Sequence, residues 1–136
     1  MELEIAKQKA IAYLVKSKKT SSDVTLKLKK LNFSDEIIEE VVSYFTELGY
    51  INDNEYVDAY MRQCMRLQNY SLFEIKNKLL QKGIKKDIIE NEITILEDLE
   101  YDNKVYEKLM LTKCKDMEPL RLKQYLYRRG LKVDEE

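Results

Sequence analysis

The sequence predicts an all-α protein built from tandem three-helix repeats, and three observations lead to that fold class. The 136 residues include only three glycines and one proline, too few turn-forming residues for a protein of many short strands. Charged residues make up 36% of the chain, and the abundant Lys, Glu, Leu and Ile favour helices. A helix–break–helix pattern also recurs, as KKLNFSDEIIEEV at 29–41, QKGIKKDIIENEI at 81–93 and YRRGLKVDEE at 127–136. A pattern that recurs at a fixed period is typical of stacked repeats.

The first helix of each predicted repeat spans roughly residues 3–17, 54–68 and 103–115. The second of these segments places several apolar or aromatic side chains on one side, at helical spacing. They are Tyr56, Val57, Tyr60, Met61, Cys64 and Met65.

The second helix of each repeat begins with a recognisable cap. Thr20-x-x-Asp23 and Ser71-x-x-Glu74 resemble capping boxes, and Pro119 suits the first position of the third such helix. Apolar residues follow at helical spacing, which predicts one buried side for each helix. They are Val24, Leu28 and Leu31 in the first repeat and Leu72, Ile75 and Leu79 in the second.

A break ends each second helix at Asn32, Gly83 and Gly130, residue types that tolerate the left-handed conformation. The apolar residue after each break can fold back onto the last turn. The third helix then opens, with Ser34 as a suitable cap in the first repeat and Lys85 as a poor one in the second. Its predicted apolar stripes are Ile37, Ile38, Val41, Val42, Phe45 and Leu48, and then Ile88, Ile89, Ile93, Leu96 and Leu99.

The repeats are predicted to span residues 1–52, 53–101 and 102–136, stacked in an elongated array. A shift of 51 residues aligns the first repeat with the second, and a shift of 47 aligns the second with the third. The third repeat is predicted to be truncated to two helices, because residues 133–136 end the sequence where its last helix would start. We expect that absence to leave the apolar side of 119–131 partly uncovered.

Charge alternates in blocks along a chain whose net charge is only -1. Residues 1–33 carry +5, 34–59 carry -8, 60–86 carry +6, 87–103 carry -7 and 104–136 carry +3. Such blocks can sort onto separate faces of stacked repeats, which the overall charge conceals.

Enzyme is the class with the least support in the sequence. The chain has no histidine, no glycine-rich phosphate loop and no calcium-loop spacing, so we predict no catalytic residue, metal or cofactor. Cys64 and Cys114 lack metal-site spacing and are predicted to be small buried thiols. No membrane-spanning or signal-peptide pattern occurs, which predicts a cytoplasmic protein, and we expect a monomer.

The candidate binding residues are basic side chains of the second and third repeats. A solvated helix surface explains each of them taken alone, whereas the clusters favour an interface. Lysine predominates among the basic residues of the whole chain, which suits point-charge contacts to phosphate and predicts salt-sensitive binding without sequence preference. The candidates are Arg62, Arg66, Lys76, Lys78, Lys82, Lys85, Lys86, Arg121, Lys123, Arg128 and Arg129.

One stretch resembles a known family. LGYINDNEYVDAYMR at 48–62 is similar to the segment that joins the first two units of RecX proteins, a family of bacterial regulators. QKGIKKDIIE at 81–90 and YLYRRGL at 125–131 resemble phrases of the family's second and third units. The resemblance covers nearly the whole chain.

The resemblance implies a non-catalytic regulator that binds filaments of the RecA recombinase on DNA. Such a protein modulates, and mainly inhibits, the ATPase, recombinase and co-protease activities of RecA, which places it in homologous recombination, DNA repair and the SOS response. Weak non-specific contact with DNA would accompany that role. Two alternatives stay open: a general DNA-binding helical protein without a recombinase partner, and a helical scaffold that binds another protein through its acidic helices.

Overall fold

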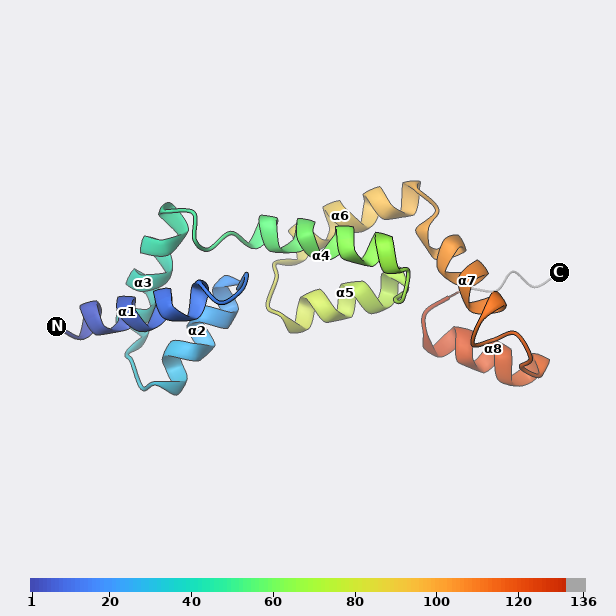
Figure 1. Ribbon diagram of the computed structural model, residues 1–136, viewed down its shortest axis with the longest axis horizontal. Helices are drawn as coiled ribbons and strands as arrows, with labels where there is room; N and C mark the ends of the chain where they lie inside the picture. The colour runs from blue at the N-terminus through green and yellow to red at the C-terminus, as the bar shows by residue number, and fades with distance from the viewer. Residues whose placement is uncertain (132–136) are drawn as a thin grey trace. The chain divides into compact units, whose positions relative to one another are not determined.

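The computed structural model describes residues 1–131, which form eight α-helices and no strands (Figure 1). These described residues divide into two compact units. Unit 1 comprises Met1–Asp58 and Lys82–Ile84, and unit 2 comprises Ala59–Gln81 and the described residues from Lys85 onward. The helices are α1 (Glu2–Leu14), α2 (Ser21–Lys30), α3 (Asp35–Glu47), α4 (Asp53–Leu67), α5 (Leu72–Gln81), α6 (Lys86–Asp98), α7 (Tyr101–Leu111) and α8 (Pro119–Arg128).

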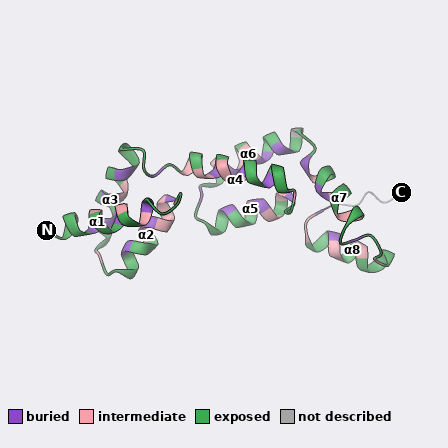
Figure 2. Ribbon diagram, in the orientation of Figure 1, coloured by how far each residue is buried: buried purple, intermediate pink, exposed green. Residues whose placement is uncertain are grey.

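Unit 1 has its core where α1, α2 and α3 pack against one another in pairs. Ala6 and Ala10 are fully buried and let the backbone of α1 approach its neighbours closely. Val24 and Leu28 of α2 and Val41 of α3 are also fully buried, so each helix turns one apolar side inward (Figure 2). This agrees with the amphipathic stripes that the sequence predicts.

Unit 2 is organised around α6, which packs against both α5 and α7. Ile75, Leu79 and Ile89 are almost completely buried, as their positions on the predicted stripes require. Tyr101 lies at the start of α7 and is buried as well. Its hydroxyl donates to the carbonyl oxygens of Cys64 (3.1 Å) and Tyr70 (2.7 Å), which fixes the loop after α4 against α7.

The predicted caps are present. Thr20 Oγ1 accepts from the Asp23 amide while the Asp23 carboxylate accepts from the Thr20 amide. Ser71 and Glu74 exchange the same pair of hydrogen bonds, at 3.2 and 3.0 Å. Ser34 caps α3, whereas Lys85 makes no side-chain cap at α6. The sequence therefore marks these helix starts correctly.

The predicted breaks are also present. Asn32, Gly83 and Gly130 have φ of 67°, 80° and 76°, in the left-handed region. The amide of Phe33 donates back to the Leu28 carbonyl, and the amide of Leu131 does the same to Leu126. These are the six-to-one bonds of a Schellman motif, and they return the apolar residue to the preceding helix.

The stripe assignment is wrong at its ends. Leu31, Leu48, Leu99 and Met65 were expected on buried sides, yet each is 40% exposed or more. The first three are the C-cap residues of their helices, where the periodicity ends with the helix itself. The expected absence of a ninth helix concerns residues 133–136, which lie outside the described residues.

Candidate partner interface

The eleven candidate basic residues fall into two groups in the structure. Some are tied into contacts within their own unit, and others extend into solvent. All except Lys82 belong to unit 2. All of them except Lys76 and Arg129 are exposed side chains, so their chemistry is that of a surface.

Three lysines of the second repeat are engaged. Lys76 Nζ lies 2.7 Å from Glu90 Oε1, which joins α5 to α6. Lys82 Nζ lies 3.3 Å from Asp23 Oδ2, a link within unit 1 between the turn after α5 and the start of α2. Lys78 Nζ lies 4.5 Å from the ring centroid of Tyr70. These lysines thus have structural partners that compete with any external ligand.

Arg129 is the most firmly held of the candidates. Its guanidinium lies 2.8 Å from Glu74 Oε1, donates to the Tyr125 hydroxyl at 2.9 Å, and donates to the Asn69 carbonyl. Only 15% of its side chain is exposed. Partial burial opposes the charge, but the hydrogen bonds to Glu74 and Tyr125 raise the pKa of Arg129 above its usual value. Arg129 therefore serves to stabilise the fold of unit 2.

The remaining candidates are exposed. Arg62 and Arg66 are four residues apart on α4, and Arg121 and Arg128 are seven apart on α8, so each pair shares a helix face. Lys85 and Lys86 begin α6, and Lys123 is exposed on α8. Within residues 1–131, Arg62, Arg66, Lys85, Arg121 and Arg128 make no ion pair. These five cations are the part of the predicted set that can meet a partner.

Sequence reasoning missed a polar junction that occurs once in each unit. In unit 2, Ser71 Oγ donates to the Arg129 carbonyl, and the Leu72 amide donates to Asp102 Oδ1 at 2.9 Å. In unit 1, Thr20 Oγ1 donates to the Lys82 carbonyl at 3.5 Å, and Ser21 donates its amide (2.8 Å) and hydroxyl (2.7 Å) to Asp53. The repeat spacing could have revealed these junctions. Thr20 and Ser71 are 51 residues apart, which is the shift that aligns the first repeat with the second.

Each junction also contains an ion pair and a glycine. Asp23 pairs with Lys82 in unit 1, as Glu74 pairs with Arg129 in unit 2. Partial burial opposes the charge of Lys82, but the hydrogen bonds that its ammonium donates to Asp23 raise its pKa above the usual value. A Cβ added at Gly83 would lie 2.7 Å from Ser22 Cβ, and one added at Gly130 would lie 2.7 Å from Phe73 Cγ. Backbone is thus packed tightly against the neighbouring helix start at both places.

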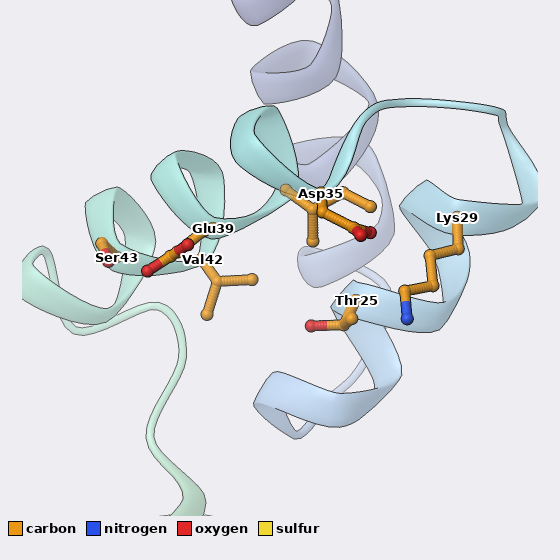
Figure 3. Close-up of a pocket in the computed structure, with 7 residues that line it drawn as sticks. Thr25, Lys29, Asp35, Glu39, Val42 and Ser43 are labelled. Carbon is orange, nitrogen blue, oxygen red and sulfur yellow. The ribbon is translucent and has the colours of Figure 1, made fainter.

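Unit 1 carries an acidic surface on α3. A shallow hollow of about 300 Å³ lies between α2 and α3. Figure 3 shows Thr25 and Lys29 of α2 across from Asp35, Glu39 and Ser43 of α3. The hollow is open and lined by both apolar and charged side chains. Such a seam suits helix packing better than the enclosure of a small molecule.

The buried thiol of Cys64 is unsuited to nucleophilic chemistry. Burial raises its pKa, which a hydrogen bond to Tyr60 and the field of Lys78 only partly offset, so the thiol stays protonated at neutral pH. In the described part of the chain no group of His, Cys, Asp or Glu side chains could hold a metal ion. No helix among residues 1–131 is long and apolar enough to cross a membrane.

Two family models match the chain. One is described as the first three-helix domain of RecX and matches residues 6–45, and the other is described as the second three-helix domain and matches 52–91. The Regulatory protein RecX of Caldanaerobacter subterraneus subsp. tengcongensis is 30% identical over 135 residues, covering 98% of this chain and 68% of that relative. The protein of the same name from Clostridium acetobutylicum is 28% identical over 89 residues, covering 65% of this chain and 41% of its own length.

Solved structures agree. The crystal structure of RecX from Lactobacillus salivarius has a TM-score of 0.78 and 27% identity, covering 97% of this chain and 90% of that one. A second crystal structure, of a regulatory protein RecX, has a TM-score of 0.84 at 23% identity and supports the fold. The chain spans 41% and 68% of the lengths of the two relatives named above.

Proposed function

The chain belongs to the RecX family of regulatory proteins, and from this premise we propose that it binds RecA filaments on DNA and mainly inhibits RecA. The inhibited activities would be ATP hydrolysis, strand exchange and co-protease function. The match along 98% of the chain to a protein named as a RecX regulator carries the proposal. The protein would act by occupying a surface, without catalysis of its own.

The exposed cations supply a physical basis for filament binding. A nucleoprotein filament presents phosphates and acidic side chains, and unpaired Arg and Lys gain more from such a surface than cations already neutralised within the protein. Arg62 and Arg66 on α4, and Arg121 and Arg128 on α8, meet that condition. Arg129, with its partners inside unit 2, contributes by holding the fold.

The direct test is DNA-stimulated ATP hydrolysis by the cognate RecA, measured with increasing amounts of this protein. Inhibition well below one protein per RecA would indicate blocked filament growth, and inhibition near equal amounts would indicate binding along the filament. Unchanged hydrolysis at equal amounts, with the helical fold verified by circular dichroism, would contradict the proposal.

A matched pair of variants locates the surface. The double variant Arg62→Gln and Arg66→Gln should raise the half-inhibiting concentration about tenfold, since each removed charge contact is worth roughly 0.5–1 kcal/mol. Lys29→Gln with Lys30→Gln removes the same charge from exposed positions of α2 and should change it less than twofold. Equal effects of both pairs would show that only net charge matters.

Binding to bare DNA is the competing function. Under that alternative, affinity for DNA alone would match affinity for the filament and would fall steeply with salt. We expect the filament to be preferred by at least tenfold at physiological ionic strength, measured by fluorescence anisotropy with labelled protein. A preference below twofold would favour the general DNA-binding function.

A further inference from the structure

The carboxylates Glu39 of α3 and Glu90 of α6 occupy the same position of the third helix in successive repeats, 51 residues apart. Glu90 has a cation beside it, because Lys76 Nζ of α5 lies 2.7 Å from its Oε1. The hydrogen bond from Lys76, together with the fields of Lys76 and Lys86, lowers the pKa of Glu90 below its usual value. Unit 2 therefore shows that a carboxylate at this position binds an ammonium group.

The matching seam of unit 1 lacks both of these cations. Thr25 occupies the position of Lys76, and Asp35 occupies the position of Lys86. Asp35 and Glu39 are four residues apart on α3, so two like charges lie on one side of the helix and repel each other. Neither carboxylate forms an ion pair with another described side chain. The carboxylate of Glu39 thus lacks the partner that its counterpart has.

A hollow of about 300 Å³ lies beside these carboxylates, between α2 and α3 (Figure 3). Ile38 and Val42 contribute apolar surface to its lining. Among the described residues that line it, Lys29 is the only cation, and it forms no ion pair. Because the hollow is open, the end of a long side chain can enter it from solvent.

We propose that this hollow binds the Lys or Arg side chain of a partner protein, with the cation held by Glu39 and Asp35. The incoming cation would take the place that Lys76 has in unit 2. Its aliphatic stem would lie against Val42 and Ile38, since long basic side chains bury their stems on apolar surface. Helix α3 contains five acidic residues and no Lys or Arg, which favours a basic segment around that side chain.

The probe is an acetylated and amidated tripeptide, Leu-Arg-Ala, titrated into the isotope-labelled full chain and followed by NMR. We expect saturable shifts of the backbone amide signals that surround the hollow. One exposed ion pair with a small apolar contact suits an affinity in the millimolar range. The same peptide with citrulline, the uncharged analogue of arginine, should bind at least threefold more weakly.

Two variants test the site, each with a matched control. Glu39→Gln should weaken binding at least threefold, whereas Glu40→Gln, at an exposed neighbour outside the hollow, should change it less than twofold. Thr25→Lys supplies on α2 the cation that Lys76 supplies on α5, and should weaken binding at least fivefold. Leu26→Lys adds the same charge at an adjacent position that is 55% exposed, and should change binding less than twofold. Circular dichroism verifies that the variants remain folded.

Several results would overturn the proposal. They are the absence of saturable shifts, equal effects of Glu39→Gln and Glu40→Gln, and equal binding of the citrulline peptide. Self-association of the chain that Glu39→Gln abolishes would make a second copy the occupant. Tighter binding of spermidine than of the peptide, if it depends on Glu39, would make a small polyamine the ligand. The assay contains neither recombinase nor DNA, so its outcome is independent of the ATPase test.

Discussion

Arg129 shows how a residue that looks like a surface contact becomes part of the fold. Its position among the basic residues before Gly130 predicted a cation for a partner or a solvated surface charge. The structure pairs it with Glu74, which is 55 residues away in sequence. Periodicity could not reveal this pairing, because it depends on how the last turn of α8 meets the start of α5.

We expect Arg129→Gln to lower the free energy of unfolding by about 1.5–3 kcal/mol, because a partly buried carboxylate at Glu74 would lose its charged partner. Arg128→Gln is the matched control and should change it by less than about 0.5 kcal/mol, since Arg128 is exposed. Urea denaturation followed by circular dichroism measures both. Similar losses in the two variants would contradict the assignment of Arg129 to the junction.

Gly130 and Gly49 separate backbone strain from close packing. Both have positive φ, at 76° and 84°, so Ala at either position costs about 1–2 kcal/mol in backbone conformation. Only Gly130 has a neighbour, Phe73, where the added methyl would lie. We expect Gly130→Ala to be the more destabilising by about 1–3 kcal/mol in thermal or urea unfolding. Equal losses would mean that Phe73 moves away freely.

At the scale of helices, the sequence was a good guide to starts, breaks and buried sides. The caps at Thr20, Ser34 and Ser71 and the left-handed breaks were predictable because each depends on a few neighbouring residues. The exposure of the C-cap residues could not be predicted in this way, because apolar residues at helical spacing continue in the sequence after the helix has ended. The candidate site was predictable only as a set of charges, since pairing depends on contacts between distant residues.

The buried sides of α5 and α6 can be tested by truncation. Leu79→Ala and Ile89→Ala should each lower the free energy of unfolding by about 2–5 kcal/mol, because their side chains are 1% and 0% exposed. Leu80→Ala, next to Leu79 and 42% exposed, should cost less than about 1 kcal/mol. A loss for Leu79→Ala no larger than that for Leu80→Ala would refute the helix orientation.

At the scale of the whole molecule, charge serves two purposes that respond differently to salt. The ion pairs Lys18–Glu55 and Lys76–Glu90 are largely exposed, and such pairs contribute little to stability. Among residues 1–131, Arg62 and Arg121 have no ion-pair partner, which suits the filament contact proposed above. We therefore expect the alternating blocks of charge to affect association more than folding.

Raising NaCl from about 50 to 500 mM should change the unfolding free energy by less than about 1 kcal/mol, since exposed ion pairs are weak and screened. Over the same range, affinity for a RecA–DNA filament should fall by more than about tenfold. Urea titrations measure the unfolding free energy, and fluorescence anisotropy measures the affinity for the filament. Binding that is insensitive to salt would argue against the exposed cations as the contact surface.

The hydroxyl caps have a kinetic consequence. Thr20 and Ser71 each complete a local helix start and also bond a carbonyl that lies 62 and 58 residues further along the chain. A loop of about 60 residues must close before the second bond can form, so it arises late, after the local helices. Ser71→Ala removes both bonds, so it should slow refolding through the lost cap and speed unfolding through the lost long-range bond, as stopped-flow chevron plots would show. The Ser71 hydroxyl thus caps a helix early in folding and later forms a long-range hydrogen bond that lowers the unfolding rate of the native state.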